Sequence, residues 1–515
     1  MVMRTYGLSG SGIDVDQMVK DLMKARRASY DKVWQQKTQL EWKKKDYNTI
    51  YTLTQDLRNN TIFDFRKSAS LQPKQVTSTN DAVVSATANA DAANVSHSII
   101  VEQLADGVKL SSTGSITTGT SKDTLVNQFG YNAADNTELN FVVNGKNVNI
   151  TITDQTTIYD VVSGLNNAGA DIKANYDATL DRFYIYSNKT GESAKVDFTG
   201  SNSDALEFIT DKLKINPNSD GDLVFTGKNA IVEIDGVKLE RESNSFQVSG
   251  VSYNLKAESY KDPNTGVRTA TTININADIE KTIANVKAFV DTYNTYMSAL
   301  NTELNETKYR DFMPLTDAQK ADMKEADIKA WEEKAKSGML RRDSLLSEIV
   351  SSARLNFTNP IEGLTGKYKT ASSIGINTGS YVDEDGKLTS DASNGGKLYV
   401  DETKLRKALE EDPEIVAKIF GNSGDTAAKQ GIANRLYDQL NNSMKKIKDT
   451  AGYPNATDTT SSLAKQLEDY DDRLYAMNDR LTQIENRYYK QFDAMEAALN
   501  RMNQQSMWLL QQFSS

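Results

Sequence analysis

The chain has 515 residues, enough for about three or four domains that each bury a core of their own. It contains no cysteine and a single histidine, which excludes disulfides, thiolate metal sites and most histidine-based catalytic arrangements. A net charge of -10 argues against a nucleic-acid-binding protein, and no run approaches the roughly 20 apolar residues of a membrane span. Residues 1–12 lack the apolar core of a secretory signal, so we expect a cytosolic chain or one exported without a cleaved signal.

A long helix is predicted near the start of the chain. Asp14 followed by Gln17 is typical of a capping box, and nothing breaks the helical pattern from there to about residue 60. Apolar residues fill about half of a seam with the 3.5-residue spacing of a coiled coil. Residues 20–45 carry nine basic residues against three acidic ones. The seam predicted in this helix consists of Leu22, Val33, Leu40 and Tyr47.

The middle of the chain is predicted to be rich in β-structure. From Pro73 to about residue 275 the pattern is one of short segments of β-branched residues separated by turns. Asn144-Gly145 and Asp235-Gly236 predict two-residue hairpin turns. The simplest topology has two nested β-rich units, which are residues 72–110 with 226–275, and residues 111–225 inserted between them.

The period becomes helical again at Asp278. Apolar residues from Ile279 to Leu304 alternate at steps of four and three, as on the seam of a helix. Residues 309–343 are highly charged, and we expect them to form an exposed insertion with one short helix. Further helices are predicted at residues 344–355 and 426–450, and residues 403–420 are predicted to form two short helices hinged at Asp412-Pro413.

The last helix, from Leu463 to about Leu509, has the most regular seam in the chain. A seam this narrow is buried only by another helix, so this helix needs a partner helix to be stable. Residues 468–473 hold four acidic residues against one basic one, opposite to the bias of the first helix. We therefore expect the two terminal helices to pair, although each charge run is equally well explained as a solvated face. The seam predicted here consists of Leu467, Leu474, Met477, Leu481, Ile484 and Tyr488.

No arrangement of catalytic residues is apparent. His97 lies between serines in a predicted strand, and we expect it to be structural or exposed. Asp383–Gly386 with Asp391 is similar to a calcium-binding loop but lacks the glutamate of its twelfth position, so we expect a turn. We expect no enzymatic activity, no cofactor and no metal.

Six strings, met in order along the whole chain, carry a resemblance to a known family. Because of these six strings, the chain resembles the flagellar filament cap family FliD, one of the hook-associated protein families. The region around Gly145 and residues 161–186 is also similar to a small β module often inserted in flagellins and hook-associated proteins. The strings are Gly12–Leu22, Ile100–Ala105, Phe289–Asn294, Gly396–Asp401 with Leu405, Leu409, Asp412, Pro413 and Phe420, Gln491–Glu496, and Met502–Leu509.

The resemblance implies an α+β multidomain fold. Long terminal coiled-coil helices and a helical leg domain would carry two nested β-rich head domains. The expected domains are residues 1–45 (N-terminal coiled-coil helix), 46–71 with 276–462 (leg, with an insertion at about 309–343), 72–110 with 226–275 (head), 111–225 (inserted outer head) and 463–515 (C-terminal coiled-coil helix).

The resemblance also implies a role. Such proteins form a homo-oligomeric ring at the filament tip, outside the cell, and promote folding and insertion of exported flagellin. The implied partners are flagellin, hook–filament junction proteins, a cytosolic flagellar export chaperone and the type III export apparatus, with no nucleic acid and no membrane insertion. Alternatives are another hook-associated or flagellin-like filament component, or a surface adhesin involved in cell adhesion.

Overall fold

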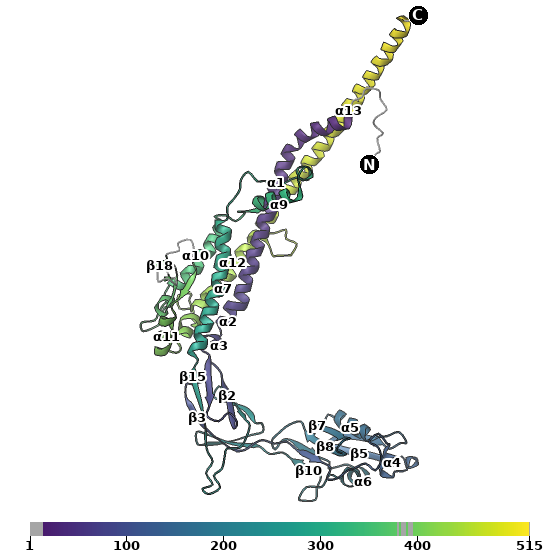
Figure 1. The fold of residues 1–515 in the computed structure, drawn as a ribbon, viewed down its shortest axis with the longest axis vertical. Coiled ribbons are helices and arrows are strands. Elements are labelled where there is room, and N and C mark those ends of the chain that lie inside the picture. Colours follow the sequence, from purple (N-terminus) through teal and green to yellow (C-terminus); the bar gives the residue numbers. More distant parts are fainter. Residues whose placement is uncertain (1–13, 379–380, 383–387, 390–394, 514–515) are drawn as a thin grey trace. The chain divides into compact units, whose positions relative to one another are not determined.

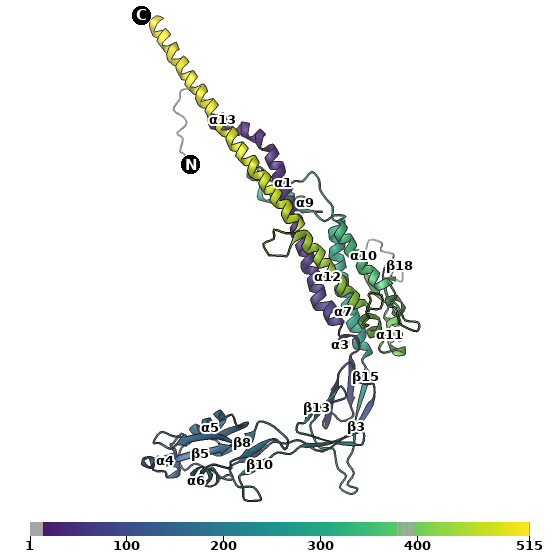
Figure 2. The same ribbon diagram turned by 180° about the vertical axis from the view of Figure 1, so that it is seen from behind.

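The structure, a computed structural model, describes residues 14–378, 381–382, 388–389 and 395–513. The chain divides into two compact units (Figure 1 and Figure 2). The helical unit comprises the chain up to Gln72 together with Ile279–Ser515, and the β unit comprises Pro73–Asp278. Long terminal helices that pack together and several β-sheets confirm the predicted α+β multidomain class.

The helical unit begins with α1 (Val15–Asp56), a 42-residue helix. Asp14 caps it by accepting the backbone N–H of Gln17 at 2.9 Å, as the sequence predicted. A π-helical segment, η1 (Leu57–Ile62), follows without a break. The other principal helices are α2 (Phe63–Phe65), α3 (Ser68–Leu71), α7 (Ile279–Asn305), α10 (Ser344–Thr358), α11 (Glu402–Glu411), η5 (Ala417–Gly421), α12 (Ile432–Ala451) and α13 (Ser462–Phe513).

Aromatic side chains from distant parts of the chain form the centre of the helical unit. The ring of Phe289 on α7 stacks on that of Phe65 at 4.4 Å and meets Phe420 edge-on at 5.6 Å. Tyr293, one turn along α7, packs against Phe357 at 5.1 Å. Ring pairs at these separations stabilise a core beyond the area that they bury. They fix α7 against α2, α10 and η5.

The charged insertion contains two helices, so the expectation of a single short helix was wrong. These are α8 (Asp317–Ala321) and α9 (Glu325–Lys336). Thr316 starts α8 with a capping box to Gln319. At five residues, α8 is too short to show an apolar period in the sequence. The insertion has a small core of its own, in which the rings of Phe312 and Trp331 lie 4.5 Å apart.

Short strands occupy the turn-rich stretch before α11. They form two antiparallel pairs that follow the short helix η4 (Ala371–Ile374). The turn expected at Asp383–Gly386, together with Asp391, lies outside the described residues. The pairs are β16 (Ile376–Thr378) with β19 (Leu398–Val400), and β17 (Tyr381–Val382) with β18 (Leu388–Thr389).

Two sheets enclose the first core of the β unit. One is five-stranded, in the order β1-β15-β3-β11-β12, and the other has the order β13-β14-β2. Buried residues of this core come from residues 83–105 and 230–275. The strands are β1 (Lys74–Ser78), β2 (Val84–Ala88), β3 (Ser96–Gln103), β11 (Ala230–Ile234), β12 (Val237–Arg241), β13 (Ser245–Val248), β14 (Val251–Leu255) and β15 (Thr271–Ala277).

The buried residues of a second core of the β unit all lie between residues 108 and 215, and Leu223 and Phe225 pack against it. Its sheets have the orders β4-β8-β7, β5-β6 and β10-β9. The finer division of the chain into the expected domains stays a prediction. The elements are β4 (Lys109–Ser111), α4 (Leu125–Phe129), η2 (Ala133–Asp135), β5 (Glu138–Val143), β6 (Lys146–Thr151), α5 (Ile158–Asn167), β7 (Ile172–Asp177), β8 (Arg182–Ser187), β9 (Lys195–Asp197), α6 (Ser203–Glu207), η3 (Phe208–Lys212) and β10 (Val224–Thr226).

Both predicted hairpin turns are present. Asn144 and Gly145 have φ values of 49° and 74° and join β5 to β6, and Asp235 and Gly236, with φ values of 49° and 81°, join β11 to β12. Two successive positive φ values define the type I′ turn, which asparagine, aspartate and glycine adopt at least cost.

Candidate assembly surface

The two terminal helices run antiparallel and side by side in both views (Figure 1 and Figure 2). The hydroxyl of Tyr489, near the middle of α13, donates to Asp16 near the start of α1 at 3.1 Å. Lys44, much further along α1, pairs with Asp458 just before α13 at 2.9 Å. The terminal helices therefore contact each other over most of α1, as the sequence predicted.

One narrow stripe of α13 is buried. Leu474 and Leu481 are only 7% and 9% exposed, and every position between the seam residues from 465 to 487 is exposed. This burial pattern repeats every 3.5 residues, as expected for helix-on-helix packing. All six predicted α13 residues lie on the stripe: Leu467, Leu474, Met477, Leu481, Ile484 and Tyr488. Their role in assembly stays a prediction.

A small hydrophobic cluster closes the outer end of the pair. Leu481 packs there with Val15, Val19 and Met23 of α1. The rings of Tyr30, Tyr488, Tyr489 and Phe492, with Ile484, partly cover it. This cluster is separate from the main core of the helical unit, so it depends on the pairing of α1 with α13 alone.

The four residues predicted for the seam of α1 have different environments. Tyr47 and Leu40 pack on the main core of the helical unit, and Val33 is buried at 8% exposure. Leu22 is 41% exposed and is not part of the cluster between α1 and α13, so its place in an assembly seam stays a prediction. Met23 lies there instead, because the first contacts of α1 follow steps of four from Val15. Those steps were the signal in the sequence that pointed to Met23.

Polar contacts fix the register of the two helices. Lys37 on α1 forms an ion pair with Asp471 on α13 at 2.7 Å, and Arg26 Nε donates to the hydroxyl of Tyr488 at 3.3 Å. Asp471 is 59% exposed at its side chain, so this ion pair contributes at most about 1 kcal/mol. The pair orients the helices, while burial of the apolar stripe supplies most of the stability.

The inner end of the pair holds a carboxylate that is 5% exposed, that of Asp458. Burial by itself would raise the pKa of Asp458, but hydrogen bonds from Ser461 and from the Lys44 ammonium outweigh it and hold that pKa well below its usual range. The backbone N–H groups of Thr460 and Ser461 donate to the same carboxylate at 3.1 Å. Asp458 therefore anchors the start of α13 to α1 in its charged form.

The charged insertion contacts the middle of α1. Gln35 Nε2 donates to the carbonyl of Pro314 at 2.9 Å, and the Lys336 ammonium lies 5.2 Å from the centre of the Trp42 ring. Trp331 Nε1 donates to the carbonyl of Met313 at 2.8 Å, which holds the contacting loop in shape. The insertion thus covers part of α1 that α13 leaves open.

Three carboxylates approach one another where α1 meets the end of α7. Burial raises the pKa of Asp46 to about 6, and the carboxylate of Glu306 adds to that rise. Burial also raises the pKa of Glu303 to about 7, to which both neighbouring carboxylates contribute. Like charges in a partly desolvated contact favour the protonated form, so this contact is weaker at high pH.

The last part of α13 extends beyond its partner helix. Every side chain described from 500 onward is exposed, and several of them are large and apolar. A helix that is stable in water needs its apolar face covered. The exposed apolar residues are Met495, Met502, Met507, Trp508, Leu509 and Leu510.

Metal binding, membrane insertion and the single histidine would be other sources of function. Among the described residues, no group of three or more histidine and acidic side chains is arranged to hold a metal ion. Nor is any helix in the described part of the chain long and apolar enough to cross a bilayer. His97 has a structural position, since its Nδ1 lies 2.6 Å from Asp235 Oδ2 and joins β3 to the turn between β11 and β12.

Comparisons with known proteins give consistent results. A family model described as the C-terminus of flagellar hook-associated protein 2 matches residues 227–504, and the model of the N-terminus of that protein matches residues 11–107. Residues 108–226, between the two matches, include the whole second core of the β unit.

Similar proteins come from several bacteria. Flagellar hook-associated protein 2 of Halalkalibacterium halodurans is 29% identical to this chain, over 99% of this chain and 100% of the relative. The protein of the same name from Escherichia coli K12 is 26% identical, over 98% of this chain and 97% of its own length.

A solved structure has the same fold. It contains domains D1–D2–D3 of the flagellar cap protein FliD from Escherichia coli, and it covers 82% of this chain and 99% of its own, with a TM-score of 0.54 at 20% identity. Together, the two matched models cover more than half of the sequence. The chain therefore belongs to the flagellar hook-associated protein 2 family, the filament cap family of the bacterial flagellum.

Proposed function

We propose that this chain assembles as a homo-oligomeric ring at the tip of the filament, where it promotes folding and insertion of exported flagellin subunits. Its family is structural and non-enzymatic, and it functions outside the cell as the cap of the flagellar filament. Its partners are components of that filament. As specific partners we propose flagellin, the hook–filament junction proteins, a cytosolic export chaperone and the type III export apparatus.

The observation that carries the proposal is the uncovered end of α13. Met502 is 56% exposed and Leu509 is 47% exposed, one heptad apart on the continuation of the seam. No other helix of the described chain covers them, since the outer contact between α1 and α13 ends near Phe492. Only another polypeptide can cover this stripe, as insertion into a filament or binding of an export chaperone would do.

The paired part of the terminal helices supports the same function. It presents a rigid rod from which the uncovered end projects, and the main core of the helical unit holds that rod through Leu40 and Tyr47. We propose that residues 1–45 and 463–515 form the anchoring helices and that 46–71 with 276–462 form the leg. Residues 72–110 with 226–275, and the inserted 111–225, would form the head.

A test replaces two apolar residues of the uncovered stripe. In cells lacking the native gene, Met502→Asp with Leu509→Asp should leave a folded, exported protein that fails to stay at the filament tip. Flagellin should then accumulate in the medium and filaments should be short or absent. The matched control, Asn500→Asp with Gln504→Asp, adds the same charge at exposed polar positions off the stripe and should be silent. Filaments of normal length with the apolar pair replaced would contradict the proposal.

A further inference from the structure

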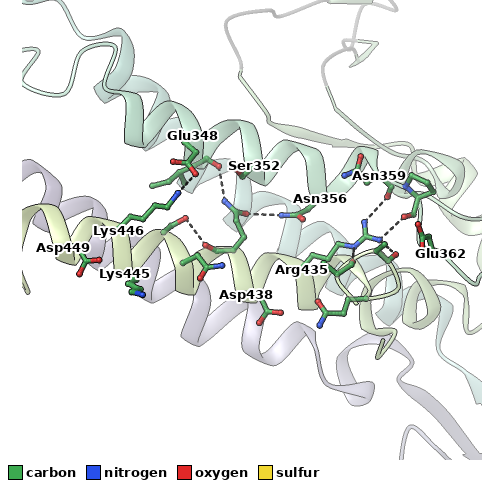
Figure 3. A pocket seen from close by; sticks show the side chains of 18 residues that line it. Glu348, Ser352, Asn356, Asn359, Glu362, Arg435, Asp438, Lys445, Lys446 and Asp449 are labelled. Atoms are coloured by element: carbon green, nitrogen blue, oxygen red, sulfur yellow. Dashed lines mark hydrogen bonds and ion pairs between the residues drawn. The ribbon is translucent and has the colours of Figure 1, made fainter. Parts of the chain in front are cut away.

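A groove of about 850 Å³ lies between α10 and α12 in the helical unit (Figure 3). One wall comes from α10, and the other from the exposed face of α12 that carries Asp438, Asn442, Lys445 and Asp449. These α12 positions recur at steps of four, three and four, so they line the groove for about 16 Å at 1.5 Å per residue. Most of the residues that line the groove have amide, hydroxyl or charged side chains.

The walls of the groove are fixed to each other. Asn356 Nδ2 on α10 donates to Gln439 Oε1 on α12 at 3.1 Å, and Gln439 Nε2 donates to the carbonyl of Ile349 at 3.1 Å. Lys446 and Glu348 form an ion pair across the helices. Because these contacts cross from one helix to the other, the groove is already formed before anything binds in it.

One end of the groove is closed by a buried cation. The Arg435 side chain is 7% exposed, and Figure 3 shows it directed at the loop around Asn359. Its N–H groups are taken up by backbone carbonyls rather than by a carboxylate. The accepting carbonyls are those of Ala427, Ala428, Asn359 and Pro360.

The exposed charges of the groove are mostly negative. Glu348 is neutralised by Lys446, but Asp438, Asp449 and Glu362 have no ion pair within the part of the chain that the structure describes. Lys445 is the only cation among the exposed lining residues described that is similarly unpaired. At its exposed surface the groove therefore presents three carboxylates, of which Glu362 interacts with the buried guanidinium of Arg435, against the one ammonium group of Lys445, together with amide oxygens that accept hydrogen bonds. This chemistry fits a cationic segment.

The same chain carries a cationic segment that the fold leaves unused. Residues 20–32 of α1 include five basic residues against two acidic ones. Lys20, Lys24, Arg27 and Lys32 are exposed, and within the described residues none of them forms an ion pair, whereas Lys37 further along α1 does. The opposite face of this segment is held on α13 through Val19, Met23 and Tyr30, so the basic face points away from α13.

The dimensions of the two surfaces also match. Lys20 and Lys32 are separated by about 18 Å along the helix, close to the roughly 16 Å between Asp438 and Asp449. Between the basic side chains lie Ala25, Ala28 and Ser29, which are small and exposed. Small side chains let one helix approach another closely, while the longer basic side chains reach the rims.

We propose that the basic face of α1, residues 20–32 of one copy of this chain, docks in the groove between α10 and α12 of a second copy. This inference rests on the proposed function, because it assigns one of the contacts through which the subunits of the cap assemble. The early part of α1 runs alongside α13 and away from α10 in both views, so the contact joins two copies rather than closing within one (Figure 1 and Figure 2). Two unlike surfaces on each subunit generate a head-to-tail assembly, which forms a ring when the rotation closes.

Charge reversal and charge exchange test the proposal. Self-association of the full chain is measured by sedimentation velocity over a concentration series. Asp438→Lys with Asp449→Lys should raise the dissociation constant at least about tenfold, and so should Lys24→Glu with Arg27→Glu. All four changes in one chain restore opposite charges and should bring the constant back to within about threefold of the wild type. The matched control on α11, Glu410→Lys with Lys407→Glu, reverses two exposed charges outside both surfaces and should have no effect.

Cross-linking tests the contact directly, since the chain has no cysteine of its own. An Ala28→Cys chain mixed with an Asn442→Cys chain should form disulfide-linked dimers under mild oxidant at a rate well above that of Ala28→Cys mixed with Glu410→Cys. Equal rates, or failure of the four-change chain to recover, would overturn the inference. Weakened binding to flagellin with unchanged self-association would also overturn it.

The result for Met502→Asp with Leu509→Asp separates this inference from the proposed function. If those changes abolish capping while the charge reversals leave self-association intact, the function stands and the groove contact is wrong. A wild-type chain that stays monomeric at every concentration would overturn the ring, and the contact with it.

Discussion

Replacing Leu481 with aspartate should separate the outer halves of the terminal helices without unfolding the rest of the protein. Leu481 is 9% exposed and packs on Val15, Val19 and Met23. Removing a leucine side chain from a small cluster costs about 2 kcal/mol, the low end of the usual range, because the helix ends can relax. A carboxylate in the same apolar position adds about 1 kcal/mol or more, even if it takes up a proton.

The sum of about 3 kcal/mol corresponds to a rise of about a hundredfold in local opening. Hydrogen exchange on a dilute monomer should therefore speed up about a hundredfold over residues 15–30 and 477–490, while the β unit stays unchanged. The matched control is Tyr475→Asp, since Tyr475 is 81% exposed on the same helix. Equal protection in the Leu481→Asp chain and the wild type would refute the reasoning, because the cluster would then not hold the helices together.

Three further changes probe contacts along α1. The folded state raises the pKa of Asp46 to about 6 and that of Glu303 to about 7. The contribution of these two groups to the free energy of unfolding is therefore greatest below their unfolded pKa values near 4 and is lost as the pH rises through 6 and 7. Asp46→Asn or Glu303→Gln should thus stabilise by about 1–2 kcal/mol at pH 8, after discounting for partial exposure, and by almost nothing at pH 4, in thermal melts. Lys44→Met should destabilise by about 1–3 kcal/mol in urea unfolding, since it removes the cation beside the buried Asp458. Trp331→Ala should release the insertion from α1, seen as faster proteolysis of residues 306–340 with a nearly unchanged melting temperature.

Each of these expectations has an outcome that contradicts it. A melting temperature for Asp46→Asn that follows the wild type at every pH would mean that the acidic contact is solvated. The control for Lys44→Met is Lys465→Met, which changes an exposed residue of α13. An equal loss of stability in the two variants would mean that the ion pair between Lys44 and Asp458 does not stabilise the fold. If the insertion resists protease as well without Trp331 as with it, its attachment depends on contacts other than the aromatic ones.

Periodicity predicted the long elements of the fold well. The helix predicted at residues 344–355 begins at the same residue as α10, and the predicted change of period at Asp278 coincides with the start of α7. Some helix boundaries depend on tertiary contacts, which periodicity does not reveal. The helix predicted from Thr426 begins at Ile432 instead, because the preceding carbonyls accept hydrogen bonds from Arg435 rather than joining the helix.

The candidate assembly surface was partly readable for a similar reason. A seam on α13 specifies that a helix covers it, and the opposite charge biases of the terminal helices pointed to α1. The register between two helices depends on contacts that neither helix reveals alone, so the sequence did not show that Met23 packs against Leu481. Among the described residues, Lys37 is the one member of the basic run that forms an ion pair with the acidic start of α13, so charge bias identified the partner helix without giving the individual ion pairs.

The pairing of α1 with α13 has a consequence for the order in which the chain folds. The hydrogen bond between Asp16 and Tyr489 closes a loop of 473 positions, whereas the β unit closes on itself where the N–H of Asp278 donates to the carbonyl of Pro73 at 2.9 Å. A chain that becomes available for folding from its N-terminus onward can therefore complete the β unit early, whereas α1 cannot pair with α13 until the end of the chain is present. Once folded, the β unit brings its two ends together and shortens the loop that remains, which lowers the entropic cost of the final closure. Folding of the β unit thus favours the later pairing of α1 with α13.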